Sequence, residues 1–224
     1  LRNILNRYLS RIEVAIRTTI IYELSNKYVA DPTWFVNPSV VSSQFINDFS
    51  VKAYQSIKKK PTIKRHHLKY LGQYAPAWKT LELCSFGTLS KLYCNFSDNK
   101  IKKEIAHQFN VPNHEVLESW LISLTLLRNY CAHHARLWNR LFNAGPQMNV
   151  KLRGSWILYQ NVNPNKLYAL LCCMAYCLDN LSLGKGKDFK CQLKKELSSH
   201  PSIDINAMGF TKNWEQEPLW DTSL

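Results

Sequence analysis

The sequence predicts an all-α fold, a helical bundle with a long central helix and an irregular C-terminal tail. Apolar residues recur at helical spacing along most of the 224 residues, and pairs that contain proline separate these stretches. No segment of convincing length alternates apolar and polar residues as a strand does. With 46% hydrophobic and 20% charged residues, the chain can bury one substantial core, so we expect a single domain over residues 1–224.

Four helices are predicted in the first half of the chain. Residues 1–28 carry the apolar stripe of a long amphipathic helix, which an Asp-Pro pair ends. An Asn-Pro pair at 37–38 starts a second helix, which runs to about residue 58. The third helix spans about 76–96 although it contains a glycine, and a Ser-Asp pair at 97–98 caps a short fourth helix.

The second half contains the longest predicted helix. Asn113 precedes an apolar stripe that continues to Asn143, where a Gly-Pro pair follows. A buried helix is expected over about 163–181 and a shorter one over 188–199. Residues 200–224 are expected to be irregular and to be anchored by aromatic side chains.

Positive charge is the strongest compositional signal. Lysine and arginine outnumber aspartate and glutamate by 29 to 16, which gives a net charge of +13. Such a surplus is typical of proteins that bind polyanions, and nucleic acid is the leading partner class, although basic charge can also serve solubility alone. A basic connector, about residues 58–75, interrupts the helical pattern. The side chains expected to grip an RNA backbone are Arg136, Arg140, Lys58, Lys59, Lys60, Lys64, Arg65 and Lys69.

The cysteines, the apolar runs and the absence of ligand motifs argue against a disulfide-bonded, a membrane-spanning and a metal-dependent protein. The seven cysteines lie mostly in apolar helical runs and form no CxxC pair, so we expect reduced core thiols and a cytoplasmic protein. The longest apolar run, residues 167–178, is too short for a membrane span. We expect no cofactor and no metal, because neither a Gly-rich phosphate loop nor metal-ligand spacing occurs. The sequence begins at Leu1 within a helical pattern, so it leaves open whether an upstream segment or a targeting signal precedes this residue.

Candidate chemistry lies in the segment RNYCAH, residues 128–133. On a continuous helix each residue advances about 100°. One polar stripe would then contain Asn129, His133, Arg136 and Arg140. His134 would turn toward the apolar face, which makes His133 the better catalytic candidate. A histidine can move the proton of a ribose 2′-hydroxyl, and the Arg128 guanidinium can stabilise the charge on a phosphate without a metal.

The segment LRNYCAHHARLWNR, residues 127–140, resembles the signature of the Abi-like (abortive infection, AbiD/AbiF type) proteins of the HEPN superfamily. Three further segments are similar to that family: RIEVAIRT at 11–18, ELCSFGTLS at 82–90, and the stretch 208–220 from Met-Gly-Phe to Pro-Leu-Trp. The likeness therefore covers nearly the whole chain.

The resemblance implies a HEPN-type helical bundle, usually a homodimer that brings two Arg-x4-6-His motifs into a basic cleft. It also implies metal-independent RNA endonuclease activity in bacterial defence, under control of an antitoxin or a noncoding RNA. Arg128 matches the arginine of the motif and Asn129 its polar follower. Both His133, after four intervening residues, and His134, after five, satisfy the spacing, so the family pattern leaves the catalytic histidine open.

Two alternatives use the same residues differently. In the first, the chain is a non-catalytic module that binds a structured noncoding RNA, with Arg128 and His133 as contacts. In the second, it is a helical scaffold whose polar stripe forms a subunit interface with a protein partner. The scaffold predicts little salt-dependent RNA affinity, whereas both RNA hypotheses predict a steep fall with salt.

Overall fold

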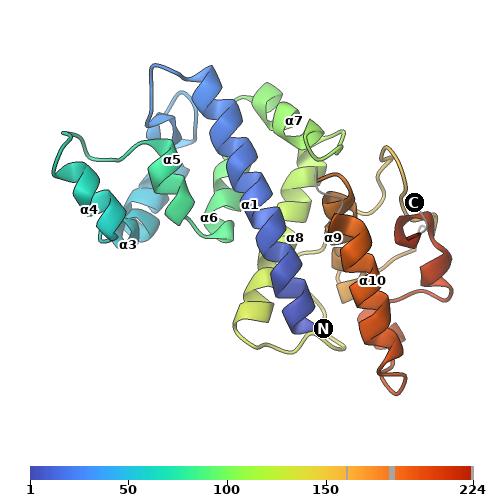
Figure 1. The fold of residues 1–224 in the computed structure, drawn as a ribbon. Helices are drawn as coiled ribbons and strands as arrows, with labels where there is room; N and C mark the ends of the chain where they lie inside the picture. The colour runs from blue at the N-terminus through green and yellow to red at the C-terminus, as the bar shows by residue number, and fades with distance from the viewer. Residues whose placement is uncertain (160, 182–184, 223–224) are drawn as a thin grey trace. The chain divides into compact units, whose positions relative to one another are not determined.

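The computed structural model describes residues 1–159, 161–181 and 185–222, and these form helices, turns and loops (Figure 1). The all-α prediction is confirmed, since pairing of extended backbone in the described ranges is limited to one bridge between Val41 and Phe96. The chain divides into two compact units. Unit 1 comprises Leu1–Glu13 and Ala106–Leu224, and unit 2 comprises Val14–Ile105. The expectation of a single domain stays a prediction.

Helix α1 (Arg2–Lys27) forms where its apolar stripe predicts it. The stripe is buried along its length and consists of Leu5, Leu9, Ile12, Ile16, Ile20 and Leu24. These positions recur every three or four residues, as one face of an α-helix requires. The turn that follows is held by Asp31, whose carboxylate accepts hydrogen bonds from the Thr33 backbone and the Asn37 side chain at 2.9 and 2.8 Å.

The second predicted helix starts later than its sequence suggests. Val41 is extended and pairs with Phe96, so the helical segment begins only at α2 (Ser43–Asp48), where the Ser42 hydroxyl accepts the N–H of Phe45. A π-helical turn, Phe49–Ala53, and α3 (Tyr54–Ile57) continue the segment to the predicted end. The Asn-Pro signal at 37–38 therefore marks a turn, which is the other structure that such pairs favour.

The third predicted helix is broken in two. Helix α5 (Ala77–Thr80) passes into a 3-10 turn, Leu81–Leu83, and α6 (Phe86–Cys94) begins after the extended Ser85. The Ser85 hydroxyl accepts the N–H of Thr88 at 3.2 Å and so caps a new helix. Arg17 donates to the freed carbonyls of Leu81 and Cys84 at 3.2 and 3.0 Å, which stabilises the break.

Two further short helices lie wholly or mostly in unit 2. Helix α7 (Asn99–His107), whose last two residues belong to unit 1, starts where predicted, with the Asp98 carboxylate accepting the N–H of Lys100 at 2.8 Å. The basic connector contains an unpredicted helix, α4 (Pro61–His67), with proline in its first turn. Ile63 and His66 are buried three residues apart on one face, and their burial stabilises a helix whose other side chains are mostly polar or charged.

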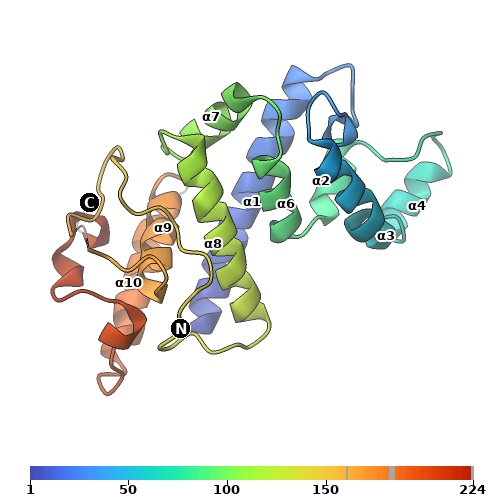
Figure 2. The same ribbon diagram turned by 180° about the vertical axis from the view of Figure 1, so that it is seen from behind.

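Unit 1 is built around α9 (Leu167–Asp179), in which every residue from Leu167 to Leu178 is buried. Helices α8 (His114–Ala132) and α10 (Lys185–Ser198) pack against it (Figures 1 and 2). Asn113 caps α8 as predicted, because its side chain accepts the N–H of Glu115 at 3.0 Å. The predicted helices over 163–181 and 188–199 are confirmed as α9 and α10, with shifted starts.

The tail after α10 is irregular, as predicted, and consists of loops and short 3-10 turns. Phe210, Trp214 and Trp220 are buried, and the Trp220 indole N–H donates to the hydroxyl of Tyr168 on α9 at 3.1 Å. The anchoring by aromatic side chains is therefore confirmed over the described part of the tail. Residues 223–224 lie outside it.

All seven cysteines are free thiols. Five are buried, namely Cys84, Cys131, Cys172, Cys173 and Cys177. Burial raises the pKa of Cys84 and of Cys177 to about 12, so both stay protonated and chemically inert at neutral pH. Among the described residues, no helix combines the length and the apolar character that crossing a bilayer requires.

Candidate functional site

The helix that carries the Arg-His segment ends at Ala132 and not at Asn143 as predicted. His133 caps it, and His134 adopts a left-handed backbone with φ of 54°. The N–H of His134 donates to the Cys131 carbonyl at 3.4 Å, and the N–H of Ala135 donates to the Tyr130 carbonyl at 2.9 Å. This pair of bonds is the Schellman motif, which ends many helices and usually has glycine where His134 stands.

The predicted polar stripe therefore does not exist. Asn129 lies in the last turn of α8, whereas Arg136 and Arg140 lie in the loop beyond the cap. The prediction was wrong because apolar residues continue at helical spacing past the end of the helix, as Trp138 and Phe142 do. No glycine or proline marks the stop, since a histidine takes the left-handed position.

Arg128 is held from two sides. Its Nε lies 3.9 Å from Oε2 of Glu13 on α1, and its Nη1 donates to Oδ1 of Asn129 at 3.4 Å. The Arg128 side chain is 36% exposed and the Glu13 side chain 14%, so the guanidinium keeps access to solvent while its partner is largely covered. Glu13 was not among the predicted site residues. Its signal was its position within the family-like segment RIEVAIRT.

Both histidines are exposed, as is Asn129. His133 stands at the C-terminal end of α8, beside the last carbonyl groups of the helix. The structure thus places Arg128, Asn129, His133 and His134 in one helical turn and its cap. They form an open, polar helix end with its arginine already oriented.

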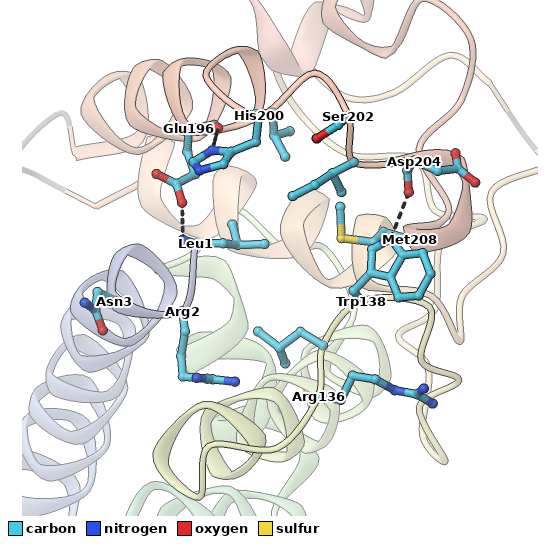
Figure 3. A pocket seen from close by; sticks show the side chains of 13 residues that line it. Leu1, Arg2, Asn3, Arg136, Trp138, Glu196, His200, Ser202, Asp204 and Met208 are labelled. Carbon is cyan, nitrogen blue, oxygen red and sulfur yellow. Dashed lines mark hydrogen bonds and ion pairs between the residues drawn. The ribbon is translucent and has the colours of Figure 1, made fainter.

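The loop beyond the cap is fixed by α1. Arg2 donates through Nη2 to the carbonyls of His134 and Ala135 at 3.3 and 3.1 Å. Arg136 is exposed and lines a cavity of about 790 Å³. Figure 3 shows Arg2 and Arg136 across this cavity from Glu196 and His200. Because acidic side chains share the lining, the cavity does not offer a uniformly basic surface to a phosphate backbone.

Arg140 packs on an aromatic ring. Its guanidinium carbon lies 3.8 Å from the centre of the Tyr130 ring, and the edge of that ring meets Phe142, with the ring centres 5.6 Å apart. The Nε of Arg140 is buried and has no hydrogen-bond partner in the described part of the chain. A cation over an aromatic face is a stabilising contact, so Arg140 has a structural role, whereas its predicted contact with RNA stays a prediction.

A family model described as Abi-like protein matches residues 1–139, which is more than half of the chain and includes Glu13, Arg128, Asn129 and both histidines. The chain belongs to the Abi-like protein family. Of the family-like segments noted in the sequence, the stretch 208–220 lies outside the matched range. No curated protein and no solved structure matches the chain. Membership suggests a function of the abortive-infection type.

In this Abi-like protein the predicted basic contacts of unit 2 are all exposed. They are Lys58, Lys59, Lys60, Lys64, Arg65 and Lys69. Three of them occupy the turn after α3, and the others lie on α4 and directly after it. The motif belongs to unit 1, so each unit contributes its own set of basic residues.

Metal ligands do not gather in the part of this Abi-like chain that the structure describes. Over residues 1–159, 161–181 and 185–222, no three His, Cys, Asp or Glu side chains are placed to hold one ion.

Proposed function

We propose that this Abi-like protein is a metal-independent endoribonuclease of the HEPN type, in which Arg128 and His133 act on the scissile phosphate. The observation that carries the proposal is the end of α8, where Glu13 and Asn129 hold Arg128 one turn before the exposed His133. Family membership and the net charge of +13 support it independently.

The chemistry requires a base, an acid and a cationic group at the phosphate, and this helix end carries the base and the cationic group. His133 takes the proton of a ribose 2′-hydroxyl, and the 2′-oxygen attacks the adjacent phosphorus. As the new O–P bond forms, the bond to the 5′-oxygen breaks, and that oxygen takes a proton from a second acid. The products are a 2′,3′-cyclic phosphate and a free 5′-hydroxyl. Arg128 stabilises the extra negative charge of the transition state through its planar donors.

We further propose a dimeric, regulated form of this enzyme. Two copies form a homodimer, and His133 of the second copy supplies the acid for the leaving oxygen. Arg136 and Arg140, together with the basic residues over 58–69, contact the RNA backbone. An antitoxin or a regulatory noncoding RNA holds the activity in check in the cytoplasm until infection releases it.

The test uses total RNA in excess EDTA. Wild-type protein is expected to cut it and leave 2′,3′-cyclic phosphate ends, whereas His133→Ala binds RNA and leaves it intact. His107→Ala, which removes another exposed histidine of unit 1, is the matched control and is expected to cut like wild type. Cleavage that EDTA abolishes would contradict the metal-independent mechanism. Binding with steep salt dependence but no cleavage by any of the proteins would favour the non-catalytic RNA-binding module.

A further inference from the structure

Unit 2 contains a cavity of about 590 Å³ that the proposed catalytic residues do not use. Its lining comes from the turn after α1, the end of α4, the loop that follows and the start of α5. Four side chains with aromatic rings and one lysine are part of this lining, namely His66, Tyr70, Tyr74, Trp78 and Lys79.

Two aromatic side chains of the cavity lining are more than half exposed to solvent. Trp78 is 51% exposed and Tyr70 is 58% exposed. The Tyr70 ring stacks on His66 with the ring centres 4.9 Å apart and the planes 24° apart, so one flat surface is already built. Large aromatic side chains usually bury most of their area, and exposed ones beside a hollow are typical of surfaces that bind flat ligands.

The charge around the cavity has one sign. Residues 58–81 contain seven lysines and arginines and no aspartate or glutamate. Glu82 follows directly but does not line the cavity, and Asp31, next to the lining residue Pro32, has its carboxylate occupied by Thr33 and Asn37. Exposed aromatic rings among lysines are the combination that binds single-stranded nucleic acids, because every base has a face to stack and every nucleotide a phosphate to neutralise.

His66 adds an independent sign of a missing ligand. It lines the cavity and is only 9% exposed, yet its Nδ1 has no hydrogen-bond partner among the described residues. Burial lowers its pKa, and the nearby Lys79 and His67 lower it further, so the ring is neutral at pH 7. A buried ring nitrogen without a partner costs free energy that a bonded ligand would recover.

We propose that this cavity binds an unpaired base of single-stranded RNA, which stacks on Trp78 and Tyr70 while the neighbouring lysines hold its phosphates. A base edge within reach of His66 supplies the missing hydrogen bond. In a duplex the base faces are covered by their neighbours, so the cavity selects unpaired segments. The inference rests on the proposed function only for the choice of RNA as the nucleic acid, and it names the form of RNA that the protein takes.

Competing occupants fit less well. An acidic peptide would use the lysines but not the stacked rings, and an apolar peptide would use the rings but gain nothing from seven positive charges without an acid. A nucleotide chain uses both features together with the unpaired ring nitrogen.

The test measures the affinity of His133→Ala protein, which leaves RNA intact, for a labelled single strand of about eight nucleotides and for the same sequence as a duplex. Adding Trp78→Ala is expected to weaken single-strand binding about tenfold and to leave duplex binding nearly unchanged. Trp78→Phe, which keeps a flat ring, retains most of the affinity. Tyr22→Ala is the matched control, because Tyr22 is another aromatic residue of unit 2 that is more than half exposed and lies outside the cavity lining.

Lys64→Ala tests charge without stacking and is expected to weaken single strand and duplex alike. Tyr70→Ala is a second test of stacking in case Trp78→Ala folds poorly. The Tyr70 side chain is more than half exposed, so its removal should disturb the fold little. If Trp78→Ala and Tyr70→Ala both bind the single strand as the parent does, or lose single strand and duplex equally, the inference is wrong.

The outcomes for the two proposals are separable. A wild-type protein that never cuts RNA, but binds single strands through Trp78, refutes the nuclease and keeps the cavity. A protein that cuts through His133, but binds single strands equally well without Trp78, keeps the nuclease and refutes the cavity.

Discussion

Glu13 and Arg128, far apart in the sequence, meet with 3.9 Å between the carboxylate Oε2 and the guanidinium Nε. The arginine of the motif is therefore oriented by α1, the helix that also clasps the following loop through Arg2. The site depends on two helices, although the motif lies on one. This arrangement explains how a residue outside the motif can affect the chemistry.

Glu13→Gln is expected to lower the rate of RNA cleavage about tenfold, because the Arg128 guanidinium is then less well oriented. The free energy of unfolding should change by less than about 1 kcal/mol, because a long, partly exposed ion pair stabilises little. Single-turnover kinetics and RNA affinity separate the effects: Glu13 acts as a positioning residue if the rate falls while affinity holds. Glu82→Gln, an exposed acid of unit 2, is the control. Equal rates for both variants would contradict this role.

Substitutions at His134 separate its backbone role from side-chain chemistry. His134→Gly removes the strain of a positive φ and is expected to keep or raise stability by up to about 1 kcal/mol, whereas His134→Val should lower it by about 1–2 kcal/mol. Urea unfolding measures both. If His133 is the catalytic base, His134→Gly still cleaves RNA; a stable but inactive His134→Gly variant would assign the chemistry to His134.

Arg140→Ala is expected to destabilise the protein by about 1 kcal/mol, because it removes the cation over the Tyr130 ring. A double-mutant cycle with Tyr130→Leu should give a coupling of similar size. Arg136→Ala removes an exposed arginine of the same loop and should leave stability unchanged. Should Arg140→Ala reduce RNA affinity at full stability, Arg140 would belong with the RNA contacts and not with the packing.

Gly209→Ala is expected to destabilise the tail. Gly209 has φ of +88°, and an added Cβ would lie 2.5 Å from Cβ of Lys166. Lys166 cannot retreat freely, since its Nζ donates to Asn139 and to the Ala207 carbonyl at 3.1 and 3.0 Å. We expect a loss of about 1–3 kcal/mol in thermal unfolding. Gly154→Ala, also at positive φ but in open space, is the control and isolates the backbone strain.

Tyr8→Phe is expected to cost stability in a pH-dependent way. The Tyr8 hydroxyl donates to Asp188 at 2.6 Å and holds the pKa of Asp188 below its usual range, while burial raises the pKa of Tyr8 to about 12. A lowered carboxyl pKa stabilises the fold above the unfolded value of about 3.9, and this contribution disappears as pH falls through the folded value. The deficit should be about 0.5–1 kcal/mol at pH 7, because Asp188 is partly exposed, and should shrink near pH 3. A deficit independent of pH would indicate a packing effect instead.

The sequence predicts which segments form helices, but it predicts the first and last residues of those helices only in part. The apolar stripe of α1 and the uninterrupted apolar run of α9 each predict a helix, because a helix buries these apolar side chains well. The break at Ser85 and the late start at Ser43 depend on contacts with residues distant in sequence, namely Arg17 and Phe96. Local patterns do not contain such contacts.

For the candidate site, the residue types were predictable and their geometry was not. Arg128 and His133 stand out by spacing, but the shared stripe assumed a helix that continues past Ala132. A left-handed histidine, in the place where glycine usually ends a helix, carries no reliable sequence signal. Glu13 was hidden for a different reason, since an acid on a basic amphipathic helix ordinarily faces water.

The aromatic tail also determines when, during synthesis, the aromatic cluster of unit 1 can form. Trp220 closes over Tyr168 and Phe189, which belong to α9 and α10, and Phe189 in turn meets Tyr8 of α1. These contacts join the beginning of the sequence to residue 220, so a nascent chain synthesised only as far as α10 lacks the last member of the cluster. If the protein cuts RNA, the messenger and ribosome that produce it are shielded until translation has passed that tryptophan.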